Sequence, residues 1–174
     1  MRTPRRDSLF SAFVAGQAAG LAMLAVAIAF AVAMGRSPFF PLQLMTAMMV
    51  GPSALEVASP STIVPGFLAH QIGPSLLWSK AFGLVVAFKS TPWRLTPSLL
   101  VGAATGIVAL VIDVYLFVPR LQMQFHARDL WSEHMSNAGS WVTHVVFGLS
   151  LGTAFWSLQE RAVTTVADSR EAGV

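Results

Sequence analysis

Two histidines and one aspartate interrupt long apolar stretches of this sequence, and they are its strongest candidates for chemistry. His70 lies in FLAHQIGPSLLW, His144 in WVTHVVFGLSLG and Asp113 in LVIDVYLF. A charged carboxylate at the centre of a membrane helix costs ~2.5–3.5 kcal/mol, so such a residue is usually paired or functional. Imidazole can neutralise a carboxylate as a cation or as a hydrogen-bond donor. We therefore hypothesise that His70, Asp113 and His144 form one proton- or ligand-binding cluster.

The composition places these residues in a membrane. Of the 174 residues, 55% are hydrophobic and 11% are charged, whereas soluble domains carry about 25% charged residues. Four apolar segments approach or exceed the ~20 residues that span a bilayer: about 8–34, 62–88, 97–118 and 138–158. Inside lipid every backbone polar group must be paired, which requires helices. The sequence predicts an all-α, polytopic four-helix bundle, with a short interfacial helix near 41–50 in the first outer loop.

The spacing of motifs predicts one membrane domain, 1–174, built from a helical hairpin used twice. Repeat 1 covers about 8–88 and repeat 2 about 97–158, with tails at 1–7 and 159–174. The first helix of each repeat opens with G-x-x-x-G, and the second carries a histidine. Because both first helices run in the same direction, the repeats are parallel, as in some transporters.

Basic residues predict the orientation in a bacterial inner membrane. With four spans, one side carries eight Lys or Arg residues and the other side three, so the positive-inside rule puts both termini in the cytoplasm. The two sets are Arg2, Arg5, Arg6, Lys80, Lys89, Arg94, Arg161 and Arg170 against Arg36, Arg120 and Arg128. These are loop charges rather than a basic stripe, so no nucleic-acid partner is expected. The first apolar run is about twice as long as a signal-peptide core, which favours a retained anchor.

Small residues predict which helix faces meet. Helices associate inside lipid by close packing at glycine, alanine and serine. His144 is followed at steps of four by two glycines, and Asp113 follows a glycine by seven residues, so both should face the bundle. The glycines expected at contacts are Gly16, Gly20, Gly102, Gly106, Gly148 and Gly152. Such faces also suit a homodimer or attachment to a larger membrane complex.

The pattern resembles a known kind of protein. The G-x-x-x-G motifs on the odd helices, a Met-rich loop before the second helix, and the even-helix motifs A-H-x-x-G and T-H-x-x-x-G are similar to small bacterial inner-membrane proteins of the YagU-like families. The similarity covers about residues 12–157. It implies a fold and no catalytic residues.

Several alternatives remain open for the histidines. Each ring can bond a neighbouring carbonyl or hydroxyl and simply fix helix register. His70 and His144 could instead ligate haem b, because imidazole is a normal axial ligand, or bind a metal together with Asp113. A surface metal site at His126 and His134 is a weaker alternative. The chain has no cysteine, so thiolate chemistry and cysteine-bound metals are excluded.

The function expected from these patterns is a non-catalytic accessory protein, or a subunit that binds a proton or small ligand. The sequence has no P-loop, dinucleotide glycine motif or G-x-S-x-G, so soluble-type enzymology is disfavoured. A small proton- or ion-linked transporter or channel, acting as a homo-oligomer, is the main alternative. A transporter needs a polar path toward the cytoplasm, which the sequence supplies only sparsely.

Overall fold

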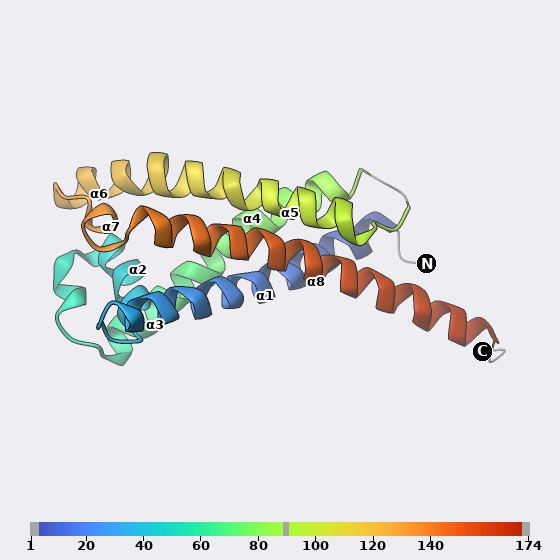
Figure 1. Ribbon diagram of the computed structural model, residues 1–174, viewed down its shortest axis with the longest axis horizontal. Coiled ribbons are helices and arrows are strands. Elements are labelled where there is room, and N and C mark those ends of the chain that lie inside the picture. Colours follow the sequence, from blue (N-terminus) through green and yellow to red (C-terminus); the bar gives the residue numbers. More distant parts are fainter. Residues whose placement is uncertain (1–3, 89–90, 172–174) are drawn as a thin grey trace.

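The computed structural model describes residues 4–88 and 91–171, and every regular element in these ranges is helical (Figure 1). The predicted all-α class is therefore confirmed. The elements are α1 (Pro4–Ala33), α2 (Phe40–Val50), the 3₁₀ turn η1 (Pro52–Leu55), α3 (Pro60–His70), the π-helical η2 (Gln71–Ser75), α4 (Leu76–Val86), α5 (Leu95–Leu110), the π-helical η3 (Val111–Phe117), α6 (Val118–His126), α7 (Leu130–His134) and α8 (Asn137–Glu171).

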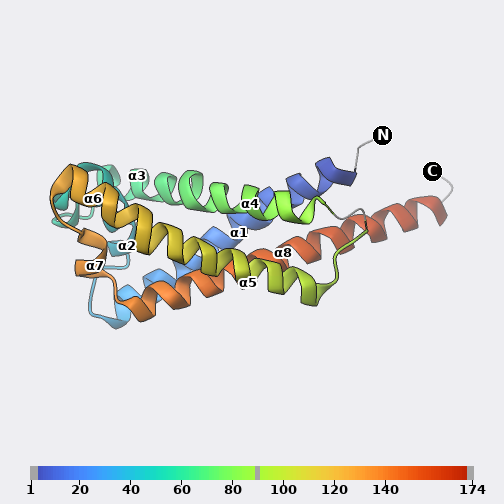
Figure 2. The same ribbon diagram turned by 90° about the horizontal axis from the view of Figure 1, so that it is seen from above.

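The long helices are arranged as columns along the long axis of the molecule (Figures 1 and 2). They are α1, α3–η2–α4, α5–η3–α6 and α8. Helix α8 packs against both α5 and α1, and α1 packs against α4. Helix α1 begins and α8 ends at the same end of the molecule, while α2 and α7 lie at the opposite end. We call this opposite end the α2–α7 end.

Three helical stretches are long and apolar enough to cross a membrane: Ser8–Ala33, Leu95–His126 and Asn137–Ala162. These stretches agree with three of the four predicted spans, and the chain is a membrane protein by length and composition. The predicted span at 62–88 instead divides into α3 and α4, which have 11 residues each. Between them the backbone leaves helical geometry at Gly73 (φ −76°, ψ −106°).

Glycine and proline explain where the columns deviate from regular α-helix. Pro74 has no N–H, so the helix loses one i→i−4 hydrogen bond and kinks beside Gly73. The third column was predicted to end at about 118, yet it continues to His126. Pro119 lies in the first turn of α6, directly after η3, where a missing N–H is tolerated. The predicted boundary was therefore too early.

Glycines bring the backbones of α5 and α8 into contact. A Cβ atom built on Gly102 would lie 2.3 Å from the carbonyl oxygen of Gly148, and one on Gly106 would lie 2.3 Å from that of His144. Similarly, a Cβ on Gly152 would lie 2.4 Å from the oxygen of Ser98. Only glycine allows such an approach, which is how membrane helices gain packing energy.

The glycines of α1 face the second column of the same chain. A Cβ on Gly16 would lie 2.0 Å from the Cβ of Ser79, and one on Gly20 would lie 2.3 Å from the Oγ of Ser75. These glycine faces are thus occupied within one chain, and the expected homodimer stays a prediction. Farther along, Phe82 of α4 meets Phe155 of α8 edge to face, with 5.1 Å between ring centroids.

Helix α2 closes one end of the molecule and coincides with the short helix predicted near 41–50. Gly66 of α3 lies against the carbonyl oxygen of Leu42, and Thr46 donates a 2.6 Å hydrogen bond to the oxygen of Thr62. From the other side, Nε2 of His126 donates to the oxygen of Met48 at 3.2 Å. Helix α2 is therefore held by both α3 and α6.

Candidate functional site

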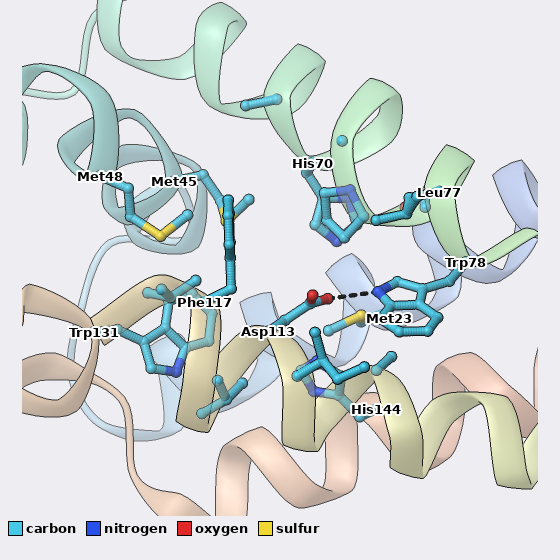
Figure 3. A pocket seen from close by; sticks show the side chains of 18 of the residues that line it. Met23, Met45, Met48, His70, Leu77, Trp78, Asp113, Phe117, Trp131 and His144 are labelled. Atoms are coloured by element: carbon cyan, nitrogen blue, oxygen red, sulfur yellow. Dashed lines mark hydrogen bonds between the residues drawn. The ribbon is translucent and has the colours of Figure 1, made fainter. Parts of the chain in front are cut away.

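His70, Asp113 and His144 line a single cavity of about 550 Å³ (Figure 3). Small-molecule sites typically measure about 300–1,000 Å³. The three residues come from three different columns, and the wall is completed by α2 at one end and by Met23 of α1. The structure thus brings together the set that the sequence singled out.

The two π-helical segments form much of the wall. His70 is the last residue of α3, directly before η2, and Asp113 is the third residue of η3. A π-helical turn inserts an extra residue and changes which side chains share a face, and such turns are common at functional sites. His144 lies two turns into α8, which is regular helix. Both irregular segments therefore border the same space.

Asp113 is held by a tryptophan and not by a histidine. Its Oδ2 accepts a 2.7 Å hydrogen bond from Nε1 of Trp78 (Figure 3). In the described part of the chain no hydrogen bond joins Asp113 to an imidazole. The sequence analysis missed Trp78, although its position offered a signal. This tryptophan lies in the middle of a predicted span, and a buried indole N–H usually has a partner.

The partners of Nδ1 define the state of both imidazoles. Nδ1 of His144 lies 2.8 Å from the carbonyl oxygen of Ser140, so this nitrogen carries the proton. Nδ1 of His70 lies 3.2 Å from Oε1 of Gln71, which also accepts from Ser75 at 3.3 Å. The amide of Gln71 is oriented by its Nε2, which donates to the oxygen of Gln17 at 3.4 Å. When a ring is neutral, its Nδ1 therefore donates and its Nε2 is left as an acceptor.

Three acceptor atoms on the wall have no protein partner. Nε2 of His70, Nε2 of His144 and Oδ1 of Asp113 make no hydrogen bond to any described residue, and none of these atoms is fully shielded from a water-sized probe. Each atom can therefore accept from a small molecule in the cavity. The purely structural alternative accounts for the Nδ1 contacts of the histidines and assigns no partner to these three acceptors.

Apolar and aromatic side chains cover the rest of the wall. Four methionines, from α1 and α2, face the cavity, together with four aromatic side chains: Met23, Met45, Met48 and Met49, and Trp78, Phe117, Trp131 and Phe147. Methionine is flexible and adapts to irregular ligands. None of the described lining residues is a lysine or an arginine. The site therefore combines an acceptor cluster with an adaptable apolar surface.

The weaker metal candidates are not brought together with further ligands. Among residues 4–88 and 91–171, no three His, Asp or Glu side chains form a group able to hold a metal ion, so the alternative of a metal shared by His70, His144 and Asp113 is not supported. His126 is bonded to α2, whereas the ring of His134 packs edge-on against Phe40 with 5.8 Å between centroids. Arg36 donates to the carbonyl oxygen of His134 at 2.9 Å. Each surface histidine is therefore engaged in a contact within the fold.

A scan of protein-family models and searches of curated proteins and of solved structures each found no match to this chain. The resemblance to YagU-like membrane proteins stays a prediction, and function has to be argued from the cavity.

Proposed function

We propose that this protein binds a small ligand or a proton in the cavity between its helices and performs no covalent chemistry. One observation carries the proposal: three unpaired acceptors, on His70, Asp113 and His144, face one cavity. A catalytic nucleophile would need a base beside it. Ser75 is the only hydroxyl among the described lining residues, and it donates to Gln71 instead of a histidine.

The proposal includes four membrane spans in the bacterial inner membrane, with both termini in the cytoplasm. The column α3–η2–α4 would be the fourth span, interrupted at its kink, and the two parallel repeats would be α1 with α3–α4 and α5–α6 with α8. The directions of the columns in Figure 1 support this layout. Single cysteines at Ser37, Thr91 and Ser136 test it, because the parent chain has no cysteine. Labelling of Thr91→Cys from outside intact cells would contradict it.

A transporter is the second candidate, and a polar interface favours it. Gln71 and Ser75, both buried, continue from His70 away from the α2–α7 end, and Gln17 bonds to the backbone of Gln71 at 3.5 Å. In the structure these groups bond to one another, so a path requires them to separate. Ion or proton flux in liposomes that Asp113→Asn abolishes would favour this candidate over simple binding.

Native mass spectrometry of the protein released from lipid nanodiscs tests ligand binding. We expect the wild type to retain a small-molecule adduct that Asp113→Asn loses. Asparagine has nearly the same shape as aspartate and can still accept from Trp78, so this variant should fold. The matched control is Glu160→Gln, which makes the same chemical change on α8 away from the cavity wall. An equal adduct in all three proteins would contradict the proposed site, and the absorption spectrum of the same sample tests haem b.

A further inference from the structure

We propose that the cavity takes a membrane-soluble primary amine, which enters sideways from the lipid between η2 and η3. This inference rests on the proposed ligand-binding function and names its ligand class and its route.

The mouth of the cavity is apolar and lies partway along the columns. Five large apolar lining side chains are also well exposed on the surface: Met49 (53%) of α2, and Ile72 (63%), Leu77 (58%), Ile112 (40%) and Phe117 (59%) on the second and third columns. The last four form the mouth. They belong to η2, α4 and η3, so the opening lies between the second and third columns. In a membrane-spanning chain, exposed apolar side chains at mid-helix contact lipid. A ligand reaching this mouth comes from the bilayer.

The end of the cavity toward α2 and α7 is covered by side chains. Figure 3 shows Met45, Met48 and Trp131 gathered there, between the acceptor cluster and the α2–α7 end. Trp131 is fixed by hydrogen bonds from its backbone N–H to Gln122, at 3.0 Å, and from its indole to Ser140, at 3.3 Å. Direct entry from water at this end would have to displace this cover. Met49 is the one large apolar lining side chain of α2 that is well exposed, whereas four such side chains border the lateral mouth, so the lateral mouth is the more open route.

The acceptor cluster defines the head group. A primary ammonium has three N–H donors and a charge opposite to that of an ionised Asp113, so it can pair with the carboxylate and still donate to an imidazole Nε2. Aromatic faces such as those of Trp78 and Phe117 also attract cations. A phosphate or carboxylate head is disfavoured, because the described wall offers it no lysine or arginine. An alcohol would supply only one donor.

The remaining wall suits an alkyl or aryl body. The methionines of α2 provide an adaptable apolar surface beside the acceptors. The rim residues Ile72, Ile112 and Phe117 would contact the part of the ligand nearest the mouth. The predicted pose therefore has the amine at the histidines and Asp113, and the chain directed toward the lipid.

The test uses the full-length protein in nanodiscs of phosphatidylcholine, which has no primary amine. The probe is a dodecylamine with a diazirine at the end of its chain, and peptide mass spectrometry locates the cross-links. We expect labels at the rim residues or the cavity methionines, removed by excess dodecylamine. Unlabelled dodecanol and dodecyltrimethylammonium should compete about tenfold more weakly, because they lack the donors or the charge-assisted hydrogen bonds.

Asp113→Asn should reduce the cavity labels about tenfold while Glu160→Gln leaves them unchanged, because only the first removes the charge facing the ligand. If Asp113→Asn does not fold, His144→Gln serves instead, since its amide can still donate to Ser140. Labels confined to other lipid-facing residues such as Leu100 would overturn the inference. Equal competition by dodecanol would overturn the amine class and leave ligand binding standing. If no amphiphile competes and no native adduct is found, both proposals fail.

Discussion

The third column, α5–η3–α6, packs closely against α8 in its first part and borders a cavity in its next part. In α5 (Leu95–Leu110), glycines at a four-residue step bring the backbone directly onto α8. In η3 (Val111–Phe117), the helix widens, the glycines stop, and Asp113 and Phe117 face a cavity. Close approach and open space therefore follow each other along this column. Figure 2 shows the column as one continuous helical ribbon.

In this column, helix packing therefore depends mainly on α5, and the proposed ligand binding depends on η3. Apolar helices gain nothing from the hydrophobic effect inside lipid, so close backbone contact supplies much of their association energy. The cavity forgoes such contacts and exposes unpaired acceptors, both of which cost stability. The glycine contacts of α5 offset that cost a few turns away. Substitutions in α5 should thus act on folding, and those around η3 on binding.

The largest effect is expected from Gly102→Ala. The added Cβ would lie 2.3 Å from the backbone oxygen of Gly148, and a backbone atom cannot rotate away as a side chain can. Forced overpacking typically costs about 1–3 kcal/mol, and separating two backbones should place this variant at the upper end. The fraction folded in a denaturing-detergent titration measures the loss.

Gly73→Ala is the matched control for that substitution. Nothing lies within 4 Å of a Cβ built on Gly73, and its φ is negative. We expect stability within about 0.5 kcal/mol of the wild type, as for other uncrowded surface positions. If Gly102→Ala and Gly73→Ala lower the stability equally, the contrast between the closely packed α5 and the open region around the cavity is wrong.

Trp78→Phe should have the next largest effect. Phenylalanine fills much of the same space but cannot donate to Asp113, whose Oδ2 would lose its 2.7 Å partner. A buried acceptor left unpaired costs about 1–3 kcal/mol. A double-mutant cycle with Asp113→Leu, which removes the acceptor, isolates this pair, and Trp141→Phe, at an exposed position, is the control. A coupling energy near zero would show that the hydrogen bond does not hold Asp113.

The apolar runs and their small residues made much of this architecture predictable. The run lengths gave the helices, and the glycine steps gave the faces by which α5 meets α8, because both follow from regular helical periodicity. The same periodicity placed His144 and Asp113 toward the interior. Three spans were identified in this way, with Gly102 and Gly148 at one contact.

Irregular turns explain most of what the sequence analysis missed. The π-helical turns at Gln71–Ser75 and Val111–Phe117 change which side chains of their columns share a face. A regular α-helical periodicity of apolar residues does not predict their positions. Gly73 is exposed and lines the cavity, so it does not belong to a packed glycine face. The partner of Asp113 was also unexpected, because Trp78 contacts it across two columns 35 residues apart in sequence. Such contacts depend on tertiary geometry.

A smaller effect is expected from Gly20→Ala. Gly20 of α1 packs against η2, the segment of the second column that borders the cavity. The new Cβ would meet the tips of two side chains, Oγ of Ser75 at 2.3 Å and Oε1 of Gln71 at 2.4 Å. These can move, so we expect a loss of about 1 kcal/mol, comparable to one hydrogen bond. Displacing Gln71 frees Nδ1 of His70, so the ¹⁵N spectrum of that ring should change while that of His144 does not. A loss of stability larger than that of Gly102→Ala would contradict the expected order of effects.

The smallest effect is expected from Glu133→Gln, outside the spans. Glu133 accepts two hydrogen bonds from Arg128, and this contact lowers the pKa of Glu133 below its ordinary value of 4.5. A lowered folded-state pKa means that the pair stabilises the protein at neutral pH and that this contribution disappears as the pH falls from about 4.5 through the lower, folded value. Both side chains are well exposed, so water and salt screen the pair. At pH 7 the free energy of unfolding of Glu133→Gln should equal that of the wild type, whereas that of Trp78→Phe should be lower. A clear loss at pH 7 that salt abolishes would show that the exposed ion pair matters more than the neutral donor inside the cavity.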